Sequence, residues 1–134
     1  MNIKCKKGVR FDILRDCIWD KLGAIYNVFK DAGYDCIITC GTEEHKEIDP
    51  HTNGYAIDLR SWHIHTEAEK KKIRDSLAFA LGHDYYVLYE GPKVGEHFHI
   101  QVRRHLWPYF MENDPQGTYM AVQSEQNTEV ADGA

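Results

Sequence analysis

The chain has 134 residues, of which 43% are hydrophobic and 28% are charged, and its formal net charge is −5. This size and composition are typical of one globular domain with a single core, and no apolar run approaches the roughly 20 residues of a membrane span. The five acidic residues after Arg104 account for the whole net charge, so the rest of the chain is near neutral, which argues against nucleic acid as a partner.

Residues 1–11 predict little beyond a short strand or an entry loop. Positive charge is present there, but no apolar segment follows it, so we expect synthesis in the cytoplasm without a Sec-type signal. The four cysteines lack the CxxC spacing of a zinc ribbon, and they are Cys5, Cys17, Cys36 and Cys40. We therefore expect reduced and partly buried thiols rather than disulfides.

A helix is predicted over residues 11–32, followed by a strand over residues 34–40. The apolar residues of the helix recur three or four positions apart, as in an amphipathic helix that lies on a core. These residues are Leu14, Ile18, Leu22, Ile25 and Phe29. Gly33 suits the left-handed cap that ends many helices, and the residues after it are rich in β-branched side chains.

The middle of the chain predicts a strand and a second helix. Residues 55–59 alternate in polarity, so Asp58 is expected on one face of a strand. The second helix begins at Thr66 with the capping-box sequence T-x-x-E, and Gly82 ends it. The intervening His63 and His65 are interpreted as surface residues.

Two further strands are predicted over residues 85–90 and 97–103. The connector between them contains two glycines and a proline, which favours an antiparallel hairpin. An aromatic patch at residues 107–110 is expected to pack on the body of the domain. Residues 113–134 are polar and acidic with little apolar content, so they predict a disordered tail.

Three histidines and an aspartate form the pattern that carries chemistry. His51 and Asp58 are seven residues apart, and Gly54 between them allows the chain to turn tightly. His97 and His99 alternate along a predicted strand, so their side chains share a face. Catalytic zinc takes about three protein ligands from His, Asp, Glu and Cys and leaves its fourth position to water. His51, Asp58 and one of the two later histidines would make such a set.

The predicted fold class is therefore α+β, with a small antiparallel sheet that carries a zinc site and packs against two main helices. One domain is expected over residues 1–112, followed by the tail.

The motif HxxGxAxD at residues 51–58, followed by HxH at residues 97–99, resembles the zinc D-Ala-D-Ala metallopeptidases (peptidase family M15). This family includes carboxypeptidases, dipeptidases and phage endolysins, and the Hedgehog signalling domain is a structural relative. The resemblance is strongest over residues 38–102 and is closest to short phage-type members. The stretches that carry this last likeness are residues 40–43, 55–60 and 87–90.

The resemblance implies that His51, Asp58 and His99 are the zinc ligands. It places His97 beside the metal, where it would hydrogen-bond the substrate or the developing oxyanion. It also implies a general base shortly before the last ligand, because a carboxylate must take and pass on the proton of the attacking water.

Two glutamates compete for the role of general base. Glu96 lies three residues before His99, the spacing of some dipeptidase members, whereas Glu90 ends the preceding strand as in Hedgehog-like and phage-like members. If the hairpin pairs Glu90 with His97, both side chains share a face with His99, and Glu96 points to the other face. Strand geometry therefore favours Glu90.

The sequence departs from the family pattern in two places. Asp49 stands where many members have a serine two residues before the first ligand, and residues 34–51 lack the arginine of many carboxypeptidase members. An endopeptidase is therefore as compatible with the sequence as a strict D-Ala-D-Ala carboxypeptidase.

The resemblance thus predicts zinc-dependent hydrolysis of a peptide bond in peptidoglycan stem peptides, of the D-Ala-D-Ala carboxypeptidase or L-Ala-D-Glu endopeptidase type. The expected partner is the stem peptide, the expected state is a monomer, and an endolysin-like protein would act on the cell wall. The alternative is a catalytically inactive zinc-containing binding module of the same fold.

Overall fold

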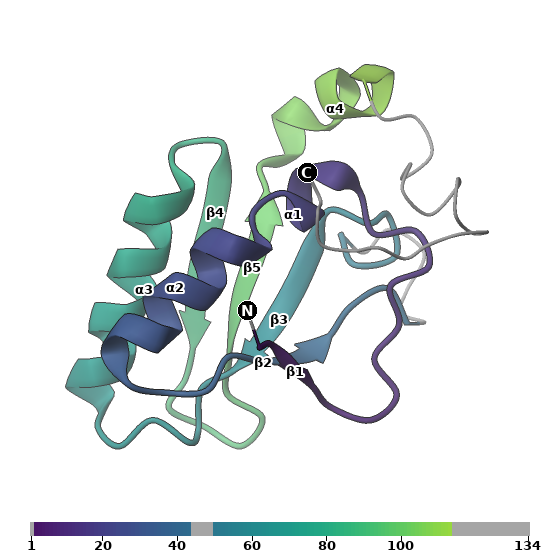
Figure 1. Cartoon of the computed structure of the whole chain (residues 1–134). Coiled ribbons are helices and arrows are strands. Elements are labelled where there is room, and N and C mark those ends of the chain that lie inside the picture. The colour runs from purple at the N-terminus through teal and green to yellow at the C-terminus, as the bar shows by residue number, and fades with distance from the viewer. Residues whose placement is uncertain (1, 44–49, 114–134) are drawn as a thin grey trace.

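The computed structural model describes residues 2–43 and 50–113 (Figure 1). The elements in chain order are β1 (Lys4–Cys5), α1 (Asp16–Trp19), α2 (Leu22–Ala32), β2 (Ile37–Cys40), β3 (Ala56–Arg60), α3 (Glu67–Leu81), β4 (Tyr85–Glu90), β5 (His97–Val102), the 3-10 helix η1 (Arg104–Leu106) and α4 (Trp107–Asn113). None of the helices within this described part is long and apolar enough to cross a membrane. Asp49 and most of the predicted tail, residues 114–134, lie outside the described residues.

The five strands form one sheet in the order β1-β2-β3-β5-β4. The predicted α+β class and the antiparallel hairpin of β4 and β5 are both confirmed. The sheet is mixed rather than wholly antiparallel, because β1 pairs with β2 in parallel at its edge. Since β5 lies between β3 and β4, the strand that carries His97 and His99 is flanked by neighbours on both sides.

The two faces of this sheet differ in chemistry. Phe98, Ile100 and Val102 of β5 are fully buried and face the apolar residues of α2 and α3. The Phe98 ring meets Phe29 of α2 edge-on, with 5.9 Å between centroids. Side chains alternate between faces along a strand, so His97 and His99 lie on the opposite face. The core therefore occupies one face and leaves the other to polar groups.

The prediction of a single helix over residues 11–32 was wrong. Helix α1 begins only at Asp16 and ends at Trp19, and two turn residues separate it from α2. Arg15 is extended because its backbone N–H donates to the Gly54 carbonyl at 3.0 Å and its Nε donates to the Asn53 carbonyl at 2.9 Å. These bonds fix the chain before Asp16 onto the loop that leads to β3.

The other predicted boundaries lie close to the observed ones. The Thr66 side chain accepts a hydrogen bond from the Glu69 N–H at 3.1 Å, as the capping box predicts, and Gly82 ends α3 with a positive φ. Strand β2 is shorter than predicted and begins at Ile37. The aromatic patch packs on the body as expected, since the buried Trp107 stacks on Tyr55 with 4.5 Å between ring centroids.

Candidate metal centre

His51 lies in the loop before β3 and is only 4% exposed. Its Nδ1–H donates to the Gly41 carbonyl at 3.0 Å, so in the neutral ring Nε2 carries the lone pair. Gly54 makes the return to β3 possible: its φ is +82°, and a Cβ there would clash with the Ile13 carbonyl oxygen. The tight turn predicted between His51 and Asp58 is therefore present, and it requires glycine.

Asp58 on β3 contacts three histidines on the polar face of the sheet. Its Oδ1 lies 3.2 Å from His51 Nε2 and 2.9 Å from His99 Nδ1, and its Oδ2 lies 3.7 Å from His97 Nε2. Burial raises the pKa of the Asp58 carboxyl, but the hydrogen bonds with His51 and His99 outweigh it and hold this pKa well below its usual range. Asp58 is therefore ionised at neutral pH, as a metal ligand must be.

His99 reaches Asp58 because β3 and β5 pair these two residues directly. Its other nitrogen, Nε2, lies 2.8 Å from the Gln101 side-chain oxygen, so a neutral ring carries its proton there and leaves Nδ1 bare. Burial lowers the pKa of His99, but its hydrogen bonds with Asp58 and Gln101 outweigh burial and raise the pKa overall. The Asp58 carboxylate therefore favours the protonated form of the His99 ring.

With both imidazoles neutral, three electron-pair donors meet at one point. His51 Nε2 and His99 Nδ1 each direct a lone pair at the same Asp58 oxygen, which is itself an acceptor. Their outer nitrogens are held by the Gly41 carbonyl and by Gln101, the arrangement in which outer partners orient metal-ligating histidines. A cation at this point relieves the repulsion among the donors, so the residues fit a metal ion.

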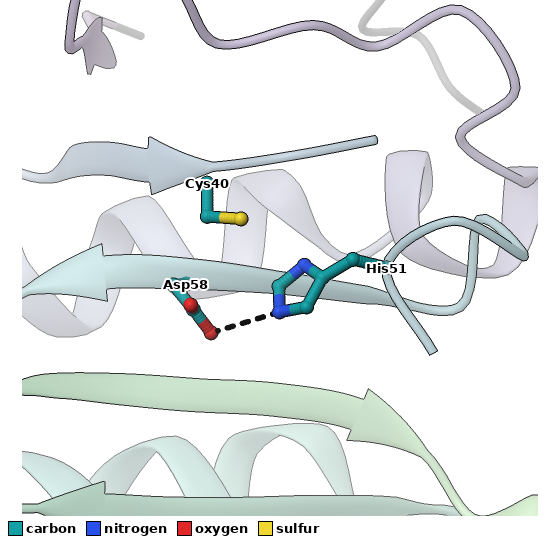
Figure 2. A group of neighbouring side chains, drawn as sticks. All are labelled: Cys40, His51 and Asp58. Atoms are coloured by element: carbon teal, nitrogen blue, oxygen red, sulfur yellow. Dashed lines mark ion pairs between the residues drawn. The ribbon is translucent and has the colours of Figure 1, made fainter. Parts of the chain in front are cut away.

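Cys40 is a further candidate ligand that the sequence did not single out. Ligand atoms of Cys40, His51 and Asp58 lie within 4.8 Å of one another, so these three side chains are positioned to hold a metal ion (Figure 2). Thiolate is a preferred ligand of zinc. All four cysteines are free thiols, and Cys40 is partly buried, but Cys5 is exposed rather than partly buried as expected.

A bulge in β2 explains why strand alternation misplaces Cys40. Ile38 pairs with Leu59, while Cys40 pairs with Asp58, so two steps along β2 match one step along β3. Strict alternation would put Cys40 on the core face with Ile38, whereas the bulge puts it on the polar face with Asp58. One sequence feature could have suggested Cys40 as a ligand. Cysteine is a preferred zinc ligand, and Cys40 ends the predicted strand directly before Gly41, whose carbonyl accepts the hydrogen bond of His51.

Glu90 lies beside His97 at the open side of the centre. The register pairs Glu90 with His97, and Glu90 Oε1 is 3.1 Å from His97 Nε2. The other nitrogen, Nδ1, donates to the Gly95 carbonyl at 2.9 Å, which fixes the ring. The Glu90 side chain is 37% exposed, so solvent or a bound molecule can reach this pair.

Glu96 occupies a different environment, although it is also a neighbour of His97. Its carboxylate accepts from Ser61 Oγ at 2.6 Å and pairs with Lys70 Nζ at 2.8 Å, and its side chain is only 8% exposed. Lys70 also pairs with Glu67 at 2.9 Å, so the network ties the β4–β5 connector to the start of α3. Such partners are typical of a carboxylate that holds a loop in place.

The structure thus brings together the sequence-predicted His51, Asp58, His97, His99 and Glu90 on one face of the sheet. Of the histidines interpreted as surface residues, His65 is exposed and His63 is half-buried. No family model, curated protein or solved structure matches the chain, so the resemblance to the D-Ala-D-Ala metallopeptidases stays a prediction.

Proposed function

We propose that this chain is a zinc-dependent peptidase that hydrolyses a bond in peptidoglycan stem peptides. One observation carries the proposal: the bare nitrogens of His51 and His99 converge on one oxygen of Asp58, with Cys40 beside them. Imidazole, carboxylate and thiolate are the ligands that zinc prefers, whereas magnesium and calcium take oxygen ligands. The donor set therefore favours zinc.

The residues beside these ligands have the chemistry of proton transfer. Zinc bound in such a set lowers the pKa of a water molecule to about 7 and polarises a carbonyl group. Glu90 would accept the proton that the attacking water loses and return it to the leaving amine. His97, held through Nδ1 by Gly95, keeps Nε2 against Glu90 and orients that carboxylate. Glu96 is already engaged with Ser61 and Lys70, which supports Glu90 as the base.

The choice of substrate rests on the resemblance of residues 51–58 and 97–99 to the D-Ala-D-Ala metallopeptidases. Both a D-Ala-D-Ala bond and an L-Ala-D-Glu bond are compatible with it. In either case the partner is the stem peptide, and the site of action is the cell wall, as for a phage endolysin.

The direct test is an assay of the purified zinc-loaded protein on synthetic stem peptides, with product release followed by mass spectrometry. We expect cleavage that a chelator abolishes and added zinc restores. Glu90→Gln should retain the fold and the zinc yet lower the rate by at least about 10²-fold, because the amide cannot accept a proton.

Glu96→Gln is the matched comparison, since it makes the same change one residue from His97. It should leave the rate within several-fold of the wild type, provided that the connector stays in place. A large loss of rate in Glu96→Gln with none in Glu90→Gln would give the base role to Glu96. A protein that binds zinc but cleaves no stem peptide would overturn the peptidase proposal.

Cys40 supports a second candidate function, a zinc-containing binding module. If Cys40 joins His51, Asp58 and His99, the metal has four protein ligands, which is the closed coordination of structural zinc sites. A closed site leaves no position for water, and the domain would then serve binding rather than hydrolysis.

Two variants separate the open site from the closed one. For a peptidase with His51, Asp58 and His99 as ligands, Cys40→Ala should keep about one zinc and most of the activity, whereas His99→Ala should lose both. For the closed site, both variants should bind zinc weakly, and the wild type should cleave no peptide. Zinc content by elemental analysis and the peptide assay together decide between the two.

A further inference from the structure

A cavity of about 350 Å³ opens beside the metal centre on the polar face of the sheet. Cys40, Asp58 and His97 line the part next to the centre, and Arg60 and Trp62 line another part of it. Lys6 and Glu96 also line the cavity, and the Glu96 carboxylate is already paired with Lys70. A substrate whose scissile carbonyl lies at the metal centre would therefore extend past the cations Arg60 and Lys6.

Arg60 is held in this wall with its hydrogen-bonding capacity unused. Its guanidinium carbon lies 4.3 Å from the centroid of the Trp62 ring, so the planar group stacks on the indole. Its Nε is buried and has no hydrogen-bond partner, and no carboxylate in the described part of the chain forms an ion pair with it. A stacked guanidinium keeps its edge of N–H donors available, which suits two-point binding of a carboxylate.

The position of Arg60 relative to the metal centre sets the distance to the group it can bind. Arg60 follows Asp58 by two residues on β3, so the two share a face, and their Cα atoms lie about 6–7 Å apart at the usual rise per strand residue. Successive Cα atoms of a peptide are about 3.8 Å apart, so this offset corresponds to one or two residues of substrate.

We infer that Arg60 binds the free α-carboxylate of the substrate residue on the C-terminal side of the cleaved bond. This inference rests on the proposed peptidase function and names the group that the enzyme recognises. An ordinary internal peptide bond has an amide at that place, which would leave the guanidinium unpaired and reduce binding.

The same group occurs at both bonds that are compatible with the site. In a D-Ala-D-Ala terminus, the last residue carries the free α-carboxylate directly after the cleaved bond. In an L-Ala-D-Glu linkage, D-Glu continues the chain through its γ-carboxyl, so its α-carboxylate is also free.

The test uses pairs of stem peptides that differ only in this α-carboxylate or its carboxamide. Wild type should cleave the carboxylate peptide with a kcat/KM about 10–100-fold higher than the carboxamide peptide, the usual worth of hydrogen bonds to a charged group. Arg60→Gln should lose this preference by slowing only the carboxylate peptide, and Arg60→Lys should keep part of it. Equal cleavage of both peptides by wild type would overturn the inference and leave the proposed function standing.

The control is Arg104→Gln, which removes a second arginine that stacks on a tryptophan, at 4.4 Å from the Trp107 ring centroid. Arg104 does not line the cavity, so this variant should keep the full preference. Lys6, the other cation of the cavity wall, is tested in the same way. Loss of the preference in Lys6→Gln with retention in Arg60→Gln would assign the carboxylate to Lys6 and refute the inference.

A binding measurement separates failure of the inference from failure of the proposed function. Zinc-loaded Glu90→Gln protein is titrated with both peptides by calorimetry, and the carboxylate peptide should bind about 10–100-fold more tightly. The double variant with Arg60→Gln should bind both equally. If wild type cleaves neither peptide, the peptidase proposal fails, while a difference in binding that depends on Arg60 still supports the carboxylate site.

Discussion

The two faces of the sheet are built from alternate residues of the same strands, yet they are stabilised in opposite ways. Phe98 is fully buried against α2, while its neighbours His97 and His99 face a cluster of carboxylates. Apolar burial stabilises the first face without any ligand. On the second face, the Asp58 carboxylate and the ring nitrogens of His51 and His99 are all electron-pair donors. Bringing them together costs stability until a proton or a metal ion is bound.

This difference predicts that folding stability and metal binding are separable at the level of single residues. A change on the helix-covered face should affect folding and leave the intrinsic metal affinity unchanged. A change among the residues around Asp58 on the polar face should alter the metal affinity and leave the fold intact. Three variants break or sharpen this comparison.

The largest effect is expected from Asp58→Ala, which should abolish zinc binding. Asp58 contacts all three histidines of the centre, and a catalytic site needs about three protein ligands. The far-ultraviolet circular dichroism of the metal-free protein should match wild type. Zinc content after dialysis measures the effect, and Asp75→Ala, an exposed change on α3, is the control that should retain zinc.

Phe98→Ala should have the next largest effect, and on folding alone. Truncating a buried phenylalanine typically costs about 3–5 kcal/mol, because it removes contacts and leaves a cavity. Urea unfolding of the metal-free protein measures this change, and Phe79→Ala is the control, since Phe79 is exposed. Zinc affinity, measured where Phe98→Ala is still folded, should stay within about threefold of wild type. A larger drop would show that the two faces are coupled.

Gln101→Met should have the smallest effect and should sharpen the ligand assignment. Gln101 accepts from His99 Nε2, and removing an outer partner of a ligating histidine typically weakens metal binding about 10–100-fold. Gln101→Glu keeps the acceptor and should retain the affinity. Competition with a chromophoric chelator measures both variants. Unchanged affinity in Gln101→Met would exclude His99 as a ligand and leave Cys40, His51 and Asp58 as the set.

Sequence reasoning predicted the parts of this molecule that follow from regular alternation. The shared face of Asp58, His97 and His99 needs only two-residue periodicity. The pairing of Glu90 with His97 was the condition on which strand geometry favoured Glu90, and the hairpin has this register. The same periodicity does not predict the position of Cys40, because the bulge in β2 breaks the alternation locally. Nothing in the residues of β2 themselves indicates where an extra residue is inserted.

The early helix was misjudged for a related reason. Apolar spacing predicted a helix from residue 11, but Arg15 is fixed by carbonyl groups of Asn53 and Gly54 that lie far along the chain. Likewise, the spacing between Glu96 and His99 could not show that Glu96 pairs with Lys70, because Lys70 lies on α3, far earlier in the chain. Long-range backbone and side-chain hydrogen bonds decided both cases.

The place of β5 between β3 and β4 has a consequence for the order of folding and for aggregation. The hairpin of β4 and β5 can form locally, but until β5 docks on β3 it presents a row of unpaired backbone groups to other chains. Asp58 and His99 are direct partners in that same docking, and 41 residues separate them. The ladder that closes this edge therefore also brings His99 to Asp58, so a newly made chain that bound a metal ion through the proposed ligand His99 would already have covered this edge of β5.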